Sequence, residues 1–96
     1  MAVAIDTIVQ RTRGVITEAV LDDVVVLDPA SGRYVRLNRT SAALWDAIAE
    51  PGVSVAALAR VLEDQHQAPS PRAQDDALGF VEAMASRGLV ELSVPV

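Results

Sequence analysis

The chain has 96 residues, 51% of them hydrophobic and 22% charged, which fits one small folded domain and not a disordered chain. Its charged residues are eight arginines and thirteen acids, for a net charge of −5, and this balance argues against nucleic-acid binding, because that affinity rests on neutralising phosphates. The lack of cysteine excludes disulfides, thiol nucleophiles and cysteine-based metal sites. No stretch approaches the ~20 apolar residues of a membrane span, and no signal peptide is recognisable, so we expect a soluble, cytoplasmic protein.

The N-terminal segment, residues 1–13, mixes apolar and charged side chains. We expect it to form a partly ordered arm that contains at most a short strand or turn. The folded domain is therefore expected over residues 14–96.

Three antiparallel strands are expected within residues 14–38. Val15 to Val20 alternates in part, and the aliphatic run from Val24 to Leu27 is typical of a central strand. A turn is predicted at Asp28 to Gly32, because proline presets φ and glycine supplies a positive φ. Arg33 to Asn38 then alternates as a third strand.

Two helices should follow these strands. Asn38, Thr40 or Ser41 is expected to cap a helix that runs to about Ala49. Ser54 is expected to cap a second helix, whose apolar stripe points inward.

A third helix is predicted to begin at the Ser70-Pro71 pair, with Ser70 as N-cap and Pro71 at the first helical position. Arg87-Gly88 has the cation and the glycine of a helix end. Val90 to Val94 alternates and predicts a short final strand. The fold class is thus α+β and winged helix-turn-helix-like, with three N-terminal antiparallel strands packed on three helices.

The sequence contains little that could carry out catalysis. His66 is the single histidine, and without cysteine it cannot form a zinc site of the usual kind. The acidic pairs Asp22-Asp23, Glu63-Asp64 and Asp75-Asp76 join adjacent residues, which diverge by about 100° on a helix and make no obvious acid–base dyad. We expect no enzymatic activity, no cofactor and no bound metal.

The order of elements raises DNA binding as an alternative. A helix that reads DNA presents basic or amide side chains to the groove. The third helix offers both kinds of charge, namely Arg72, Gln74 and Arg87 beside Asp75, Asp76 and Glu82. The topology suits a DNA-binding regulator, whereas the electrostatics do not.

The third strand is the most informative segment. It should lie at a sheet edge, and Arg33, Arg36 and Arg39 form the only local concentration of positive charge. A basic edge strand suits an extended acidic peptide added as a further strand. Charged side chains equally protect exposed edges from aggregation, and the residues alone leave both interpretations open.

An ordered set of short motifs resembles the PqqD-like family over about residues 15–92. The set consists of Asp23-Val24-Val25-Val26-Leu27-Asp28, Gly32-Arg33-Tyr34, Leu37-Asn38, Ser41, Leu44-Trp45, Val55, Leu58 and Gly88-Leu89-Val90. Two positions depart from the pattern: Val35 stands where a second aromatic residue is common, and Asp22-Asp23 stands where Asp-Gly is frequent.

The resemblance implies a precursor-peptide recognition element, which binds the leader of a ribosomally made precursor and presents the core to modifying enzymes. It is most similar to the free-standing recognition protein of lasso-peptide clusters, whose partners would be a cysteine-protease leader peptidase and an ATP-dependent cyclase. A chaperone for the radical-enzyme pathway to pyrroloquinoline quinone is the alternative within the family.

The resemblance also implies where the leader would bind, as an added strand in a groove between the third strand and the third helix. The implied site residues are Arg33, Tyr34, Val35, Arg36 and Leu37 of the strand, and Asp76, Gly79, Phe80 and Ala83 of the helix. Leu78, Val81 and Ala85 are assigned to the core. On this basis Arg33 and Arg36 are expected to favour acidic leaders.

Overall fold

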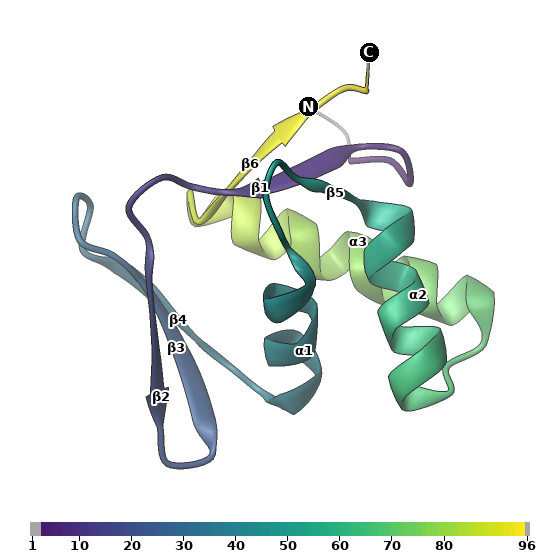
Figure 1. The fold of residues 1–96 in the computed structure, drawn as a ribbon, viewed down its shortest axis with the longest axis horizontal. Coiled ribbons are helices and arrows are strands. Elements are labelled where there is room, and N and C mark those ends of the chain that lie inside the picture. The colour runs from purple at the N-terminus through teal and green to yellow at the C-terminus, as the bar shows by residue number, and fades with distance from the viewer. Residues whose placement is uncertain (1–2, 96) are drawn as a thin grey trace.

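The computed structural model describes residues 3–95 and forms an α+β fold (Figure 1). Its strands are β1 (Ile8–Arg11), β2 (Ile16–Val20), β3 (Asp23–Asp28), β4 (Arg33–Leu37), β5 (Val53–Ser54) and β6 (Val90–Ser93). Its helices are α1 (Arg39–Ala47), α2 (Val55–His66) and α3 (Ser70–Ser86). The three antiparallel strands β2, β3 and β4 precede the three helices, as the sequence predicts, and β1 comes before them in the chain.

The β2-β3-β4 sheet is an antiparallel meander with β3 at its centre. The predicted turn between β3 and β4 is present, since the Gly32 amide donates to the Asp28 carbonyl oxygen over 2.8 Å. Gly32 has a φ of 74°, which glycine adopts without steric cost. Because β3 lies at the centre, β2 and β4 are the two edges of the sheet.

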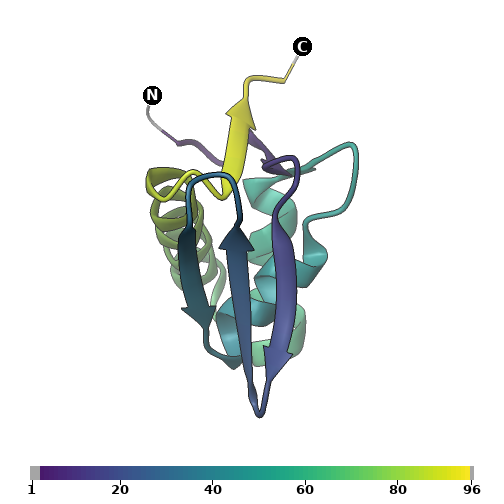
Figure 2. The same ribbon diagram turned by 90° about the vertical axis from the view of Figure 1, so that its left-hand side faces the viewer.

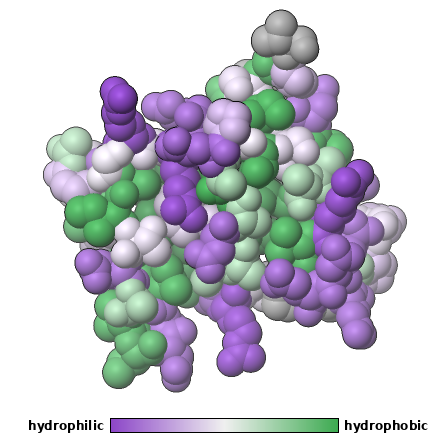
Figure 3. Space-filling view, in the orientation of Figure 1, coloured by the Kyte–Doolittle hydropathy of each residue, from purple (hydrophilic) through white to green (hydrophobic). Residues whose placement is uncertain are grey.

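The two faces of this sheet have different environments. Val26 and Leu37 face the core and are 0% and 3% exposed. The opposite face carries a cross-strand row in which Leu27 lies between Ile16 and Tyr34. In Figure 3 apolar atoms also gather at the lower left, over the free end of the β2–β3 hairpin, where Leu21 is exposed. The sheet is thus buried on one side only.

A second sheet has the order β5-β1-β6 and lies at the top of the molecule in the view of Figure 1. Strand β1 comes from the segment expected to be an arm, and it is the central strand of this sheet, with Val9 fully buried. A Cβ built at Gly52 would lie 2.9 Å from a side-chain carbon of Ile8. Only glycine permits so close a passage of the chain beside β1.

The helix caps agree with the sequence at two of three predicted positions. The Asn38 side chain accepts from the Ser41 amide over 2.8 Å, and the Ser54 side chain accepts from the Ala57 amide over 3.1 Å. The predicted Ser70 cap was wrong, because α3 begins at Ser70 itself and its N-cap has no side-chain bond. The Ser70 hydroxyl instead donates to the carboxylate of Glu63 on α2, which removes it from the helix end.

Trp45 lies where β1, β2 and α1 meet, and its side chain is fully buried. Its indole Nε1 donates to Thr17 Oγ1 over 2.9 Å. The Arg11 guanidinium lies 4.6 Å from the ring centroid, and its Nη2 donates to the Trp45 carbonyl oxygen over 2.7 Å. A cation over an indole face is attractive, so Arg11 joins the N-terminal strand to the core of the domain.

The helices complete a single hydrophobic core. Its buried members include Leu44, Ile48, Val55, Leu58, Leu62, Ala73, Ala77, Val81, Met84 and Leu89. Within the part of the chain that the structure describes, no helix is long and apolar enough to cross a membrane.

Candidate functional site

The free edge of β4 lies on the side of the sheet where α3 runs past it (Figure 2). At the start of β4, Arg33 Nη1 donates to the carbonyl oxygen of Ser86 in the last turn of α3, over 3.4 Å. At the end of β4, Asn38 lines a hollow together with Gly79 and Phe80 of α3. The strand and the helix therefore run in opposite directions, with an unpaired strand edge between two defined ends.

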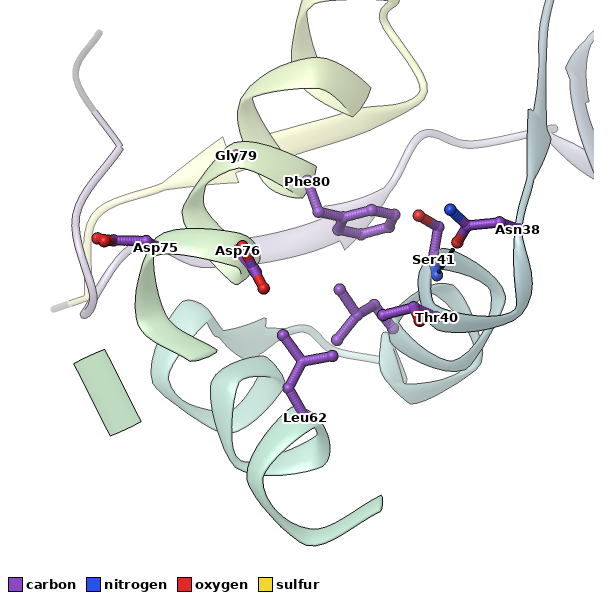
Figure 4. Close-up of a pocket in the computed structure, with 9 residues that line it drawn as sticks. Asn38, Thr40, Ser41, Leu62, Asp75, Asp76, Gly79 and Phe80 are labelled. Atoms are coloured by element: carbon purple, nitrogen blue, oxygen red, sulfur yellow. Dashed lines mark hydrogen bonds between the residues drawn. The ribbon is translucent and has the colours of Figure 1, made fainter. Parts of the chain in front are cut away.

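The hollow beyond the end of β4 has a volume of about 320 Å³. Figure 4 shows it between α1, α2 and α3, with the Phe80 ring pointing towards Ser41 and Asn38. The full lining consists of Asn38, Thr40, Ser41, Leu44, Leu62, Asp75, Asp76, Gly79 and Phe80. Leu44 and Leu62 are buried below it, so the hollow has an apolar floor and a polar rim.

A second hollow, of about 350 Å³, adjoins the first and shares Thr40, Leu62 and Asp76 with it. It also reaches Arg72, whose Nε lies 3.8 Å from a carboxylate oxygen of Asp76. Both side chains are more than half exposed, and such exposed pairs add little stability. The two hollows form one trough that continues from the end of β4.

The side chains of the five β4 residues expected at the site lie on opposite faces of the sheet. Val35 and Leu37 pack against the core, whereas Tyr34 and Arg36 lie on the opposite face, with Tyr34 69% exposed. Arg36 Nε lies 3.6 Å from Asp23 of β3, so its charge is directed across the sheet and not towards α3. From this strand, Arg33 is the side chain that reaches the helix.

The α3 residues expected at the site lie along one side of the helix. Asp76, Gly79 and Phe80 line the hollow, and Ala83 is exposed one turn further on. A Cβ built at Gly79 would have no protein atom within 4 Å. Space is therefore open above the middle of α3, beside the edge of β4.

The core side of α3 is rotated relative to the sequence assignment. Val81 is fully buried as expected, but Leu78 and Ala85 are only half-buried. The other fully buried positions of the helix are Ala73, Ala77 and Met84. Two of these are alanines, which pass unnoticed in a search for large apolar residues, and they allow α2 to pack closely against α3.

Sequence reasoning missed the half of the hollow that α1 and α2 supply. The sequence predicts Asn38, Thr40 and Ser41 as helix caps, with Asn38 and Ser41 also in the family motif, and it gives none of them, nor Leu62, a place at the site. A polar helix start that directly follows an edge strand could have indicated them. The residues that follow such a strand lie at its end and can line a hollow there.

Two other features of the described residues bear on possible chemistry. Among the described residues, no group of three or more His, Cys, Asp or Glu side chains could hold a metal ion. The side chain of His66 lies outside the described part of the chain. A hollow near Arg11 is bordered by Asp46 and Glu50, and its mixed charges point to no particular ligand.

Comparison with known families gives a match for most of the chain. A family model described as coenzyme PQQ synthesis protein D (PqqD) matches residues 23–90. No curated protein matches the sequence.

Three solved structures share the fold of this chain. TbiB1 in complex with the TbiA(beta) leader peptide has 21% identity and a TM-score of 0.75, over 85% of this chain and 94% of its own. A lasso peptide synthetase B1 complexed with the leader peptide has 22% identity and a TM-score of 0.75, over 86% and 96%. The PqqD truncation of Methylobacterium extorquens PqqCD, a stand-alone recognition element for ribosomally synthesised and post-translationally modified peptides, has 20% identity and a TM-score of 0.70, over 88% of each chain.

Proposed function

The chain belongs to the PqqD family, and from this premise we propose that it is a non-catalytic protein that binds the leader region of a ribosomally made precursor peptide. The leader adds as a strand to the free edge of β4 and is covered by α3. The bound precursor is then delivered to modifying enzymes, namely the leader peptidase and the cyclase of a lasso-peptide pathway.

The observation that carries this proposal is the unpaired edge of β4 beside α3, which ends in a trough. An exposed strand edge offers main-chain donors and acceptors to an extended peptide, and pockets next to it select side chains. Two structures of this fold are complexes with leader peptides. The fold and the free strand edge together favour peptide binding over DNA binding. DNA binding is disfavoured because α3 carries exposed acids at Asp75, Asp76 and Glu82.

The leader's contacts can be divided by their role. Hydrogen bonds from the β4 backbone provide affinity with little dependence on sequence. The trough provides selectivity, since its floor is apolar and the first hollow, of about 320 Å³, has room for a large side chain. Leu44, Leu62 and Phe80 would surround an aromatic or aliphatic anchor, and Asn38 and Ser41 would offer hydrogen bonds at the rim.

A fluorescence-polarisation titration tests leader binding. The probe is the labelled leader of the precursor peptide encoded beside this gene, and the controls are a scrambled leader and a random DNA duplex. We expect saturable binding of the leader alone, with a Kd in the micromolar range or tighter. Binding of the duplex without binding of the leader would contradict the proposal and favour the winged-helix regulator.

Delivery is tested separately, by reconstitution with a leader peptidase and a cyclase of a lasso-peptide pathway. Addition of the chain should accelerate cleavage of the full precursor but not of a precursor without its leader. Stimulation of a radical enzyme in place of these partners would assign the chain to the pyrroloquinoline quinone branch of the family.

A further inference from the structure

The two ends of the β4–α3 site carry opposite charge. We infer that the leader which binds here has a fixed charge order, with a cationic or hydrogen-bond-donating segment N-terminal to its anchor and carboxylates C-terminal to the anchor. This inference rests on the proposed function and adds the chemistry and the direction of the peptide.

The end of the site at the start of β4 is basic. Arg33 reaches across from the strand to the Ser86 carbonyl oxygen, and Arg87 Nη1 donates to the Ala83 carbonyl oxygen over 3.2 Å. Both guanidinium groups are exposed, at the C-terminal end of α3, where the helix dipole favours cations. The facing carboxylate, Asp28, accepts from the Ala30 amide and from Ser31 Oγ, so it is engaged within its own turn.

The end of the site beyond β4 is acidic. Asp75 and Asp76 line the hollow, and Figure 4 shows that Asp75 points away from Phe80 on the outer side of the helix. Arg72 pairs with Asp76, which leaves a net charge of −1 from these three residues. Arg39, at the start of α1, is exposed nearby but lines neither hollow. The remaining polar groups at the rim are Asn38, Thr40 and Ser41. A basic or neutral donor group is therefore accepted here, and a carboxylate is repelled.

The direction of the peptide follows from the sheet. Both strand pairings in the meander are antiparallel. A peptide that adds antiparallel to β4 continues this hydrogen-bond pattern, and antiparallel pairing is more stable per residue than parallel pairing. A peptide antiparallel to β4 enters beside Asn38 and leaves beside Arg33. Its N-terminal part then lies at the acidic end and its C-terminal part at the basic end.

The experiment is a selection from a displayed library of random linear peptides on the immobilised protein, which requires no knowledge of the natural leader. We expect the enriched peptides to share an apolar or aromatic anchor, with Arg or Lys enriched before it and Asp or Glu enriched after it. A single peptide from the selection, and the same peptide with its charged residues exchanged between the two ends, are then titrated. The exchange should weaken binding about tenfold, and less at high salt, where exposed charges are screened.

Two charge-reversal variants assign each preference to its end of the site. All four positions are exposed, so the variants should fold like the wild type. The Arg33→Glu/Arg87→Glu variant should lose the preference for acids after the anchor and keep the preference for bases before it. The Asp75→Arg/Asp76→Arg variant should do the opposite.

The outcomes separate this inference from the function on which it rests. Enriched peptides that compete with one another but show no charge order would overturn the inference and leave peptide binding intact. The reverse charge order would overturn the antiparallel direction. A selection that enriches no peptide above an empty support would contradict the proposed function itself.

Discussion

Arg33 Nη1 and the Ser86 carbonyl oxygen lie 3.4 Å apart, one at the start of β4 and the other in the last turn of α3. This contact spans the space between the edge strand and the helix at one end, while the hollow between Asn38 and Phe80 marks the other end. The contact and the hollow therefore mark the two ends of the free β4 edge.

The Gly79→Ala variant should be more stable but bind the leader less tightly. Alanine in place of an exposed helical glycine stabilises a fold by about 0.5–1 kcal/mol, and no protein atom lies within 4 Å of the added Cβ. The same methyl group would intrude on a peptide that lies close to α3, and we expect a loss of about tenfold in affinity. Thermal unfolding and polarisation titration measure the two effects.

The matched control for this variant is Gln74→Ala, at an exposed α3 position that lines neither hollow of the trough. It should leave affinity unchanged. Unchanged affinity in Gly79→Ala as well would mean that the peptide backbone does not approach this part of the helix.

Proline in β4 should distinguish the two sides of the strand. Backbone amides alternate between the neighbouring strand and the free edge, so Val35→Pro and Arg36→Pro remove donors on opposite sides. One variant should lose leader binding and remain folded, because proline is tolerated on an edge strand where the amide faces outward. The other should lose stability, since it breaks a bond to β3. Circular dichroism and leader titration would show this, and wild-type affinity in both variants would exclude strand addition at β4.

Tyr34→Ser should leave leader affinity within about twofold of the wild type, because that side chain is 69% exposed on the face of the sheet away from the core. Phe80→Leu keeps a similar volume, at a cost in stability below about 1.5 kcal/mol, but removes the ring that lines the hollow. It should weaken binding by about fivefold, or 1 kcal/mol. A larger effect from Tyr34 than from Phe80 would place the peptide on the outer face of the sheet.

Removal of residues 1–13 tests whether the domain includes the N-terminal segment. The shortened chain lacks β1, the central strand of its sheet, and the buried Val9 side chain. It also lacks the Arg11 contact with Trp45. We expect a loss of more than about 3 kcal/mol from a total of about 5–15 kcal/mol, measured by urea unfolding. A cooperative transition at the wild-type urea concentration would show that residues 14–96 form the domain alone.

The parts of the fold that sequence predicts correctly are those determined by neighbouring residues. The turn at Asp28 to Gly32, the Asn38 and Ser54 caps, and the alternation in β4 each depend on a few consecutive side chains. The family resemblance added the expectation of a site between β4 and α3, which local patterns alone do not supply.

The parts that sequence does not predict depend on contacts between distant segments. Val53–Ser54 is too short to show any periodicity, and it becomes a strand because β1 lies beside it. Ser70 has the chemistry of a cap, but Glu63 on the neighbouring helix binds its hydroxyl. The hollow likewise exists only because α1 and α2 converge on α3, and no window of sequence contains that information.

Trp45 is the only tryptophan of the chain and is fully buried, which gives the protein an internal optical reporter. Its emission depends on the indole bond to Thr17 and on the Arg11 guanidinium over the ring. Because it lines neither hollow of the trough, its fluorescence should follow separation of β1 and β2 from α1 and change little when a peptide binds at β4. Unfolding can therefore be recorded without a label, whereas a binding titration needs its chromophore on the peptide.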